Sequence, residues 1–159
     1  MITNEANVVL ERMTFDGAAT LGNLFELYVH DFSEHVPLQI KASGRFELTP
    51  SDVWWTRNDH FAYFIKVRAE LAGFALVRAG SRVVPAPEVM DVAEFFVLRG
   101  VRRKGIGNLA AQALFKTFPG PWEIRVRRTN VVAMQFWSAV AGGVRAKSRI
   151  EQLIFSRRN

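Results

Sequence analysis

The chain has 159 residues, 49% of them hydrophobic and none of them cysteine, so disulfide bonds and thiolate chemistry are excluded. This length fits one domain with a hydrophobic core, and no low-complexity linker divides it, so we expect a single domain over residues 1–159. The net charge is +6, but residues 1–98 hold 13 acidic and 8 basic residues, whereas residues 99–128 hold 1 and 8. A basic region of this kind suits nucleic acid or a ligand with several phosphate groups.

The sequence lacks the patterns of membrane, secreted and metal-binding proteins. Its first residues have no basic start followed by an apolar core, and no stretch approaches about 18 uninterrupted apolar residues. His30, His35 and His60 have no metal-ligand spacing with any carboxylate. We therefore expect a cytoplasmic protein that binds neither a membrane nor a metal ion.

The N-terminal third predicts a strand, a helix and an irregular segment. Residues 6–14 form a short β-prone run, and Thr20 is a suitable N-cap for a helix that must end before Pro37. Residues 33–59 contain prolines and a glycine without a clean period, which indicates loops with a short helical turn. One apolar stripe runs along the predicted helix: Leu21, Leu24, Phe25, Tyr28 and Phe32.

Three strands are predicted in the middle of the chain. Residues 61–67 and 70–78 are β-prone runs separated by two residues, which indicates a hairpin, and Gly73 suggests a bulge in the second run. A proline-containing loop over residues 81–89 leads to a third run at residues 91–98. The apolar density of this third run predicts that both of its faces are buried.

Helices and strands alternate in the C-terminal part. Residues 105–118 have helical spacing and stop at Pro-Gly-Pro, and residues 122–128 alternate like a strand. A helix is predicted over residues 130–140, closed by the glycines at 142–143, and a last strand over residues 149–156. The element order predicts a mixed α+β fold rather than a doubly wound sheet. The stripe of the first of these helices consists of Ile106, Leu109, Ala110, Ala113, Leu114 and Phe118.

The segment before the helix at 105–118 has the chemistry of an anion site. A helix N-terminus offers unpaired N–H groups and the positive end of the helix dipole. Because Gly105 and Gly107 lack a Cβ, phosphate oxygens can approach the main chain closely. The third glycine of a dinucleotide fingerprint and the Gly-Lys-Ser/Thr of a Walker loop are both absent, so neither of those sites is predicted.

The same segment resembles a known motif. Its Arg102-x-x-Gly105-x-Gly107 pattern, which follows Val97 at the end of a predicted strand, is similar to the Arg/Gln-x-x-Gly-x-Gly/Ala loop of the GNAT superfamily of N-acetyltransferases. In that family the loop holds the pyrophosphate of acetyl-coenzyme A. The resemblance therefore implies acetyl-coenzyme A as the acyl donor.

A second motif lies on the helix at 130–140. Asn130-x-x-Ala133-x-x-Phe136-Trp137 looks like the family's Asn-x-x-Ala-x-x-Phe-Tyr segment. Together with the order of the elements, the resemblance covers nearly the whole chain. It implies a central, mostly antiparallel twisted sheet of six to seven strands, splayed between the fourth and fifth strands and flanked by helices.

The resemblance also implies the residues that bind coenzyme and perform catalysis. Glu94 is the expected general base for the amine, with Asp91 as second choice, although a charged residue here can also be a solvated strand end. A bulge near Val97 would direct a backbone N–H toward the oxyanion of the tetrahedral intermediate that forms during acyl transfer. The expected coenzyme residues are Phe96, Val97, Leu98, Arg102, Arg103, Lys104, Gly105, Ile106, Gly107, Asn108, Asn130 and Trp137.

Two of these positions have a second interpretation. Asn130 is as good a helix N-cap as a coenzyme ligand, and both roles can hold together. Trp137 replaces the family's Tyr, and its indole N–H cannot act as a useful acid. The departing thiolate is therefore protonated by Ser138, Tyr28, Tyr63 or water, or it leaves unassisted.

The acceptor site is implied by the family to come from the first helix and the following loop. Its expected residues are Tyr28, Asp31, Glu34, Trp54 and Trp55, although a Trp pair is also typical of a core. The acidic balance of residues 1–98 suits a cationic amine, on a small molecule or a peptide.

Two other functions remain open at this point. One is a coenzyme-binding module that has lost catalysis. The other is a basic nucleic-acid binder, which the clustering of charge around the glycine loop does not favour. Dimers are common in the family, and no feature of this sequence decides for or against a homodimer.

Overall fold

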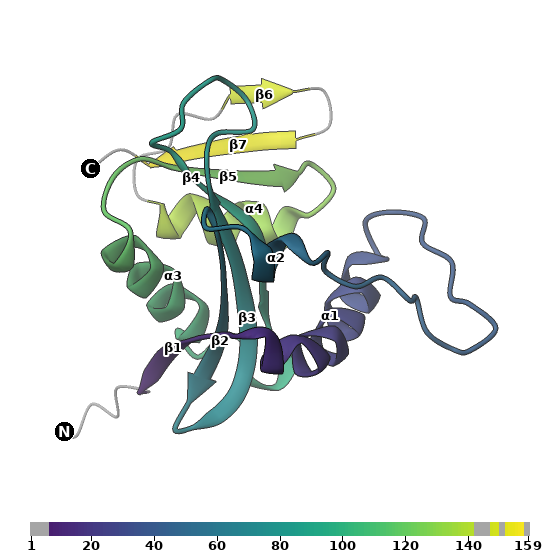
Figure 1. Ribbon diagram of the computed structural model, residues 1–159. Coiled ribbons are helices and arrows are strands. Elements are labelled where there is room, and N and C mark those ends of the chain that lie inside the picture. The colour runs from purple at the N-terminus through teal and green to yellow at the C-terminus, as the bar shows by residue number, and fades with distance from the viewer. Residues whose placement is uncertain (1–6, 142–146, 150–151, 158–159) are drawn as a thin grey trace.

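A computed structural model of the chain describes residues 7–141, 147–149 and 152–157. Its centre is a seven-stranded sheet in the order β1-β2-β3-β4-β5-β7-β6 (Figure 1). The strands are β1 (Val8–Arg12), β2 (His60–Val67), β3 (Glu70–Ala79), β4 (Met90–Val97), β5 (Trp122–Arg127), β6 (Lys147–Arg149) and β7 (Gln152–Arg157). The helices are α1 (Ala18–Phe32), α2 (Val53–Thr56), α3 (Ile106–Thr117) and α4 (Val131–Val140).

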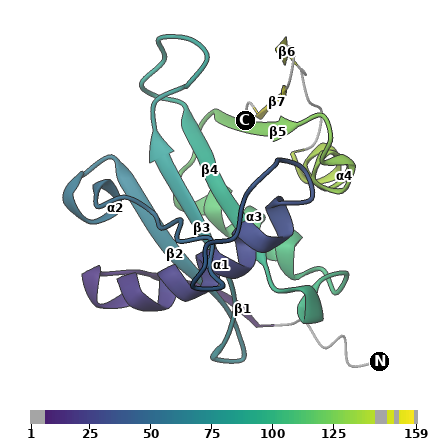
Figure 2. The ribbon, with the colours of Figure 1, turned by 90° about the vertical axis from the view of Figure 1, so that its right-hand side faces the viewer.

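The sheet is mostly antiparallel and opens between β4 and β5. Strands β1 to β5 form its main body, and β7 and β6 extend it beyond β5. The parallel pair β4–β5 is joined at three positions only, Met90–Val92 against Trp122–Ile124. Figure 2 shows β5 leaving β4 at a steep angle. The predicted mixed fold and the separation of the fourth and fifth strands are therefore confirmed.

The helices cover opposite faces of the sheet. In Figure 1, α1 lies to the right of the central strands and α3 to the left. Leu21 and Leu24 of α1 and Trp54 of α2 share one core cluster with the sheet, whereas α3 and α4 pack into another with Trp122. On α3, Leu109 is exposed and Phe115 is buried, so the predicted stripe on that helix is partly wrong.

Two predicted boundaries are wrong. Thr20 is not an N-cap, because a 3₁₀ turn at Phe15–Gly17 leads directly into α1 and places Thr20 inside the helix. The single last strand predicted at 149–156 is two antiparallel strands, β6 and β7. The glycines at 142–143, expected to close α4, lie outside the described residues.

The strands β2, β3 and β4 are held in register by a tight turn and two irregularities. Arg68 and Ala69 both adopt positive φ, as a two-residue type I′ hairpin requires. The β2–β3 register shifts beside Gly73, where a bulge was predicted. Gly73 is also required by β4, since a Cβ there would lie 1.9 Å from the carbonyl oxygen of Phe96. The backbones of β3 and β4 therefore approach as closely as only glycine allows.

Candidate active site

A cavity of about 620 Å³ lies where β4 and β5 separate. One side of its lining comes from α1 and α2, including Tyr28 and Trp54, and the other side from α4 and its N-cap, including Trp137 and Asn130. Residues of β3, β4 and β5 form the walls between them. The cavity therefore reaches both faces of the sheet through the opening between the strands. The prediction that β4 is buried on both faces is wrong at its centre, because Ala93, Glu94 and Phe95 line this cavity and are only partly buried.

A bulge in β4 aims Glu94 into the cavity. Leu76 of β3 pairs with Glu94 and the next residue, Val77, pairs with Val92, so Ala93 is the extra residue. Residues three apart on a regular strand point to opposite faces, but this insertion brings Glu94 to the face of Asp91. The bulge expected near Val97 therefore lies at Ala93, and Val97 pairs in register with Gly73.

The Glu94 carboxylate is held by a phenol from α1. The hydroxyl of Tyr28 donates a short hydrogen bond to Oε2 of Glu94. Burial raises the pKa of Glu94 above its ordinary value, although the Tyr28 hydrogen bond and the charges of Arg125 and Arg78 act against this. Burial, together with the neighbouring carboxylate, also raises the pKa of the Tyr28 phenol. The pair therefore keeps the phenol protonated and makes the carboxylate a stronger base than an exposed one.

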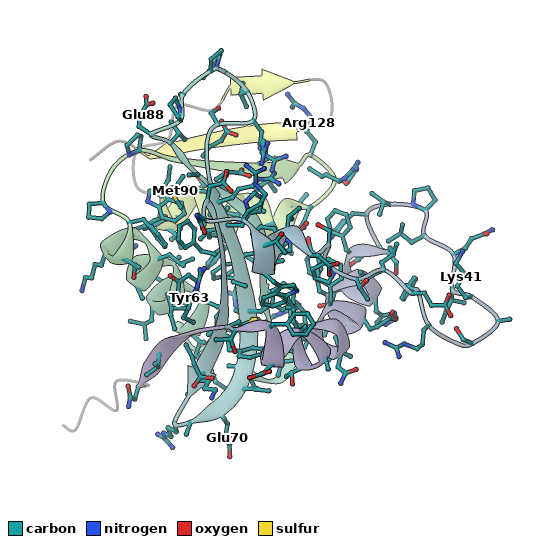
Figure 3. The ribbon with its side chains drawn as sticks, viewed as in Figure 1. Lys41, Tyr63, Glu70, Glu88, Met90 and Arg128 are labelled. Atoms are coloured by element: carbon teal, nitrogen blue, oxygen red, sulfur yellow. The ribbon has the colours of Figure 1, made fainter. Side chains whose placement is uncertain are left out.

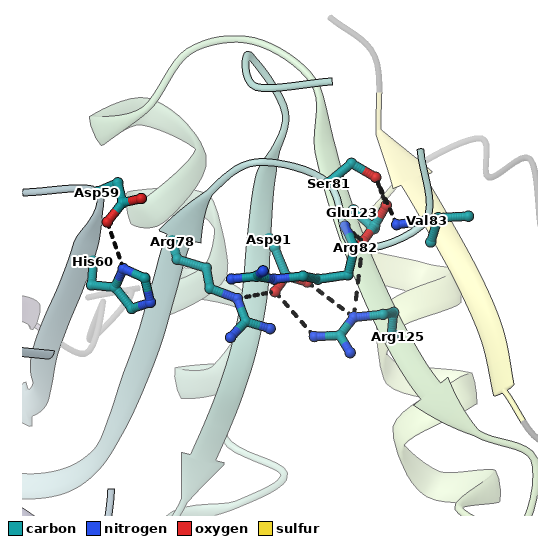
Figure 4. A network of polar contacts seen from close by, with 9 residues as sticks. All are labelled: Asp59, His60, Arg78, Ser81, Arg82, Val83, Asp91, Glu123 and Arg125. Atoms are coloured by element: carbon teal, nitrogen blue, oxygen red, sulfur yellow. Dashed lines mark hydrogen bonds and ion pairs between the residues drawn. The ribbon is translucent and has the colours of Figure 1, made fainter. Parts of the chain in front are cut away.

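Asp91 lies deeper and is bound by two arginines (Figure 4). It is fully buried and accepts from Nε of Arg78 at 2.8 Å and from Nε and Nη2 of Arg125 at 3.2 and 3.0 Å. Asp91 does not line the cavity, whereas Arg78 and Arg125 do. This arrangement excludes Asp91, the second choice for the base, from contact with an acceptor.

Neither Arg78 nor Arg125 was expected from the sequence to belong to the acceptor site. For Arg125 a signal existed, because buried Trp122, Ile124 and Val126 alternate along β5 with Glu123 and Arg125. For Arg78 no local signal existed, since its partner Asp91 belongs to β4, which a long loop separates from β3.

The loop between β4 and α3 presents backbone N–H groups. Gly105 is the N-cap of α3 with φ 77°, and Arg103 also has a positive φ. The first intrahelical hydrogen bond runs from the N–H of Leu109 to the carbonyl oxygen of Gly105. The N–H groups of Ile106, Gly107 and Asn108 come before it and therefore have no intrahelical acceptor. A Cβ on Gly107 would lie 3.1 Å from the ring of Phe136. The two glycines thus have separate roles, one in the turn and one against α4.

The basic side chains of this loop divide into two groups. Arg102 is bound to Asp31 of α1 and to the carbonyl oxygen of Val97, and Arg99 also pairs with Asp31. Burial alone would raise the pKa of Asp31, but the hydrogen bonds and charges of Arg102 and Arg99 outweigh it and lower this pKa. The exposed Arg103 has no partner among the described residues, and Nζ of Lys104 reaches only the carbonyl of Gly100 at 3.2 Å. Arg102 thus joins the loop to α1 while Arg103 and Lys104 stay open to a ligand.

The predicted site residues are only partly brought together. Tyr28, Trp54, Glu94, Asn130 and Trp137 line the cavity. Three expected acceptor residues do not: Asp31 holds the loop arginines, Glu34 is exposed, and Trp55 contacts Phe15.

The residues at the end of β4 belong to the core. Phe96 and Val97 are buried there and Leu98 packs against it. Asn130 combines both of its interpretations, because its side chain accepts from the N–H of Ala133 as an N-cap and also borders the cavity. Of the suggested proton donors, Tyr28 lines the cavity, and Tyr63 and Ser138 do not.

In the part of the chain that the structure describes, no three His, Asp or Glu side chains are grouped so that they could hold a metal ion. No helix in the same part combines the length and the apolar character needed to cross a bilayer.

Comparison with known proteins gives one family and a set of similar folds. Residues 22–142 match the sequence model of the Acetyltransferase (GNAT) family. No curated protein matches the chain. A solved acetyltransferase from Thermus thermophilus has 15% identity and a TM-score of 0.74, over 96% of this chain and 97% of that chain.

Two similar structures contain ligands. PaiA N-acetyltransferase from Thermoplasma acidophilum, in complex with coenzyme A, has 12% identity and a TM-score of 0.69, over 96% of this chain and 99% of that chain. An aminoglycoside acetyltransferase in complex with coenzyme A and kanamycin has 12% identity and a TM-score of 0.72, over 96% and 95%. At these identities the likeness concerns the fold.

Proposed function

This chain belongs to the GNAT family of acetyltransferases, and on that premise we propose that it transfers an acetyl group from acetyl-coenzyme A to the amine of an acceptor by direct attack. The observation that carries the proposal is the cavity between β4 and β5, because it joins a basic carboxylate on one side to Asn130 and Trp137 on the other. We take residues 1–159 as one acetyltransferase domain.

The chain has features that fit coenzyme A. The free N–H groups at the start of α3, with Gly105, Ile106, Gly107 and Asn108, would hold the diphosphate. Arg103 and Lys104 would add charge. Arg102 would act mainly by fixing the loop to Asp31, so it would reach the phosphates only by giving up that pair.

The main chain of β4 fits the pantetheine arm. Beyond Val92, β4 keeps β3 on one side but has lost β5 on the other. Along such a strand, alternate residues direct N–H and C=O groups to the open side. The main-chain groups of Phe96, Val97 and Leu98 were expected to serve the coenzyme. Leu98 N donates to Ala72 of β3, so by this alternation Phe96 also faces β3, and Val97 O is bound by Arg102. The main-chain groups of Phe95 and the N–H of Val97 are therefore the better candidates.

Glu94 serves as the general base. Acetyl-coenzyme A supplies the acetyl group as a thioester, whose carbon–sulfur bond breaks as the acceptor nitrogen forms the amide. Glu94 takes the proton that the nitrogen loses, and its raised pKa favours this at neutral pH. No dedicated acid for the leaving sulfur is assigned. Tyr28 already donates to Glu94, and a thiol pKa of about 8.5 allows departure as thiolate.

The proposal is tested with the matched variants Glu94→Gln and Glu88→Gln. Glu88 is an exposed loop residue outside the cavity. Acetyl-coenzyme A should raise the melting temperature of the wild type and of both variants. Free-thiol release with a panel of amines should fall by about 10²- to 10⁴-fold in Glu94→Gln alone.

Other results would favour the other interpretations. A melting shift without thiol release for any amine would indicate a coenzyme-binding module. No melting shift, together with salt-sensitive retention of DNA or RNA, would contradict the proposal and favour a nucleic-acid binder.

A further inference from the structure

The charged side chains on the cavity are predominantly positive. Among the described residues, its lining contains three arginines, Arg78, Arg125 and Arg127, and one carboxylate, Glu94. Arg127 lies over the ring of Phe32, with its Cζ 5.8 Å from the ring centroid. The acidic residues that were expected to receive a cationic amine, Asp31 of α1 and Glu34 just after it, are not part of this lining.

Asp91 leaves several donors of these arginines unused. It accepts from Nε alone of Arg78 and from Nε and Nη2 of Arg125. Both terminal nitrogens of Arg78 and Nη1 of Arg125 have no acceptor among the described residues. The two side chains are 21% and 24% exposed. Asp91 thus fixes the two guanidinium groups while their free N–H groups remain available to a ligand.

Among the described residues in and beside the cavity, arginines outnumber carboxylates by one: Arg78, Arg82, Arg125 and Arg127 against Asp91, Glu94 and Glu123. Arg82 lies beside Arg78 and Arg125, as Figure 4 shows, and one buried carboxylate, Asp91, joins those two arginines. The second carboxylate, Glu123, is occupied by the Ser81 hydroxyl and the Arg82 N–H, and is 3.9 Å from Arg125. Burial, and the charges of Arg82 and Arg125, act to lower the pKa of Arg78, against the attraction of Asp91. An anion at this point would relieve the repulsion.

This positive region is separate from the phosphate site. Asp91 is near the start of β4, and the glycine loop follows its end at Val97, which places them about 20 Å apart at roughly 3.3 Å per residue. Figure 3 shows Met90 toward one end of the sheet and Glu70, at the β2–β3 turn, at the other. Gly73 pairs with Val97 near that turn. One extended coenzyme with its phosphates at α3 therefore leaves the arginines to the acceptor.

We propose that the acceptor is an amine carrying a carboxylate a few bonds away, as an amino acid does, and that Arg78 and Arg125 bind this carboxylate while the amine faces Glu94. This rests on the proposed acetyltransferase function. On β3 the partners of Asp91 and Glu94 are Arg78 and Leu76, whose Cα atoms are about 7 Å apart on one face of the strand. The guanidinium groups bound to Asp91 and the Glu94 carboxylate therefore lie on one face of the sheet, where a carboxylate and an amine a few bonds apart can meet both. Polyamines and aminoglycosides would instead place further cations against three guanidinium groups.

The first experiment compares matched acceptors with the wild-type enzyme and acetyl-coenzyme A. The pairs are methionine with 3-(methylthio)propylamine and phenylalanine with phenethylamine. Hydrogen bonds to charged groups contribute about 1.5–3 kcal/mol, so the carboxylated member should have a kcat/KM roughly 10- to 100-fold higher. O-Phosphoethanolamine against ethanolamine tests whether a phosphate can replace the carboxylate. Equal rates within the carboxylate pairs, or a preference for the plain amines, would overturn the inference and leave the proposed function intact.

The second experiment uses Arg78→Met with Arg82→Met as its control. Arg78→Met keeps an apolar chain of similar length, and Asp91 retains Arg125. The carboxylate preference, measured as the ratio of kcat/KM within each pair, should disappear through a higher KM for the amino acids. Loss of the Arg78 charge beside Glu94 changes the rates of both members of a pair and cancels in this ratio. Arg82 is exposed and outside the cavity lining, so Arg82→Met should keep the preference. A preference that survives Arg78→Met would contradict the inference.

A binding measurement on the wild type tests the inference even if Arg78→Met does not fold or no acceptor is turned over. With coenzyme A present, calorimetry on the wild type should detect N-acetylmethionine and should detect no binding of its methyl amide. Failure of the anionic ligand to bind, when coenzyme A itself binds, overturns the inference whatever the activity. Binding of N-acetylmethionine without any thiol release would retain the anion site and reject the transfer reaction.

Discussion

Glu94 depends on two neighbours for its proposed chemistry. Ala93, the extra residue of the bulge, turns the carboxylate toward the cavity, and Tyr28 donates a hydrogen bond to it. Burial raises the carboxyl pKa, and the phenol offsets part of that effect. The hydroxyl of Tyr28, together with the charges of Arg125 and Arg78, therefore limits how far burial raises the pKa of Glu94, because each stabilises the charged form.

Replacing Tyr28 by Phe tests this balance. Without the hydroxyl, the pKa of Glu94 should rise further, since a group that stabilises the carboxylate is lost. Activity requires the deprotonated base, so the acidic limb of the kcat/KM profile should move to higher pH. Tyr63→Phe is the control, because Tyr63 is buried away from the cavity and should leave the limb in place. An unmoved limb in Tyr28→Phe would show that Glu94 is not the titrating base.

At the scale of elements, the site exists because β4 pairs closely with β3 and leaves β5. The contact of Gly73 with the Phe96 carbonyl brings β3 and β4 together, and the bulge at Ala93 twists β4 where its pairing with β5 stops. Bulges increase local twist, which favours the separation of the next strand.

The close pairing predicts opposite effects for two glycine substitutions. Gly73→Ala places a Cβ 1.9 Å from a backbone oxygen, so it should lower the free energy of unfolding by about 1–3 kcal/mol or more. Gly22→Ala lies within α1 with no atom within 4 Å of the new Cβ, and should raise it by roughly 0.5–1 kcal/mol. Urea denaturation measures both. An unchanged stability in Gly73→Ala would mean that β3 and β4 can separate without cost.

At the scale of the whole molecule, the cavity that gives Glu94 its proposed role also lowers the free energy of unfolding. It keeps Glu94 partly buried at the junction of α1, β4 and β5 instead of filling the gap with apolar side chains. The pKa of Glu94 is higher in the folded state than in the unfolded state, so between the two pKa values the folded state retains a proton that the unfolded state has lost. The free energy of unfolding is therefore reduced as the pH rises from the unfolded pKa of about 4.3 through the folded value.

Removal of this charge should stabilise the protein at neutral pH. Glu94→Gln is expected to have a higher free energy of unfolding than the wild type at pH 7, and the difference should shrink as the pH falls toward 4. Glu88→Gln, at an exposed position, should show no such pH-dependent difference. Denaturation at a series of pH values measures this. A Glu94→Gln variant that is less stable than the wild type at pH 7 would contradict the destabilising role of the carboxylate.

The sequence alone determined the features that depend on neighbouring residues. Apolar periodicity placed α1 and α3, the two-residue gap at Arg68 and Ala69 indicated the hairpin, and the glycine loop indicated an anion site before α3. Each of these follows from contacts within a few positions, where spacing and residue type fix the geometry. The two motifs then indicated the family.

Only the tertiary structure decided what meets across the sheet. Asp91 is fixed between Arg78 and Arg125 because three strands align, and Asp31 holds the loop arginines because α1 packs beside the end of β4. The position of the bulge in β4 also depends on how β4 pairs with β3. A shift of the bulge by one residue would reverse which side chains face the cavity. The charge that an acceptor meets therefore follows from strand register and packing, which join residues that the sequence keeps far apart.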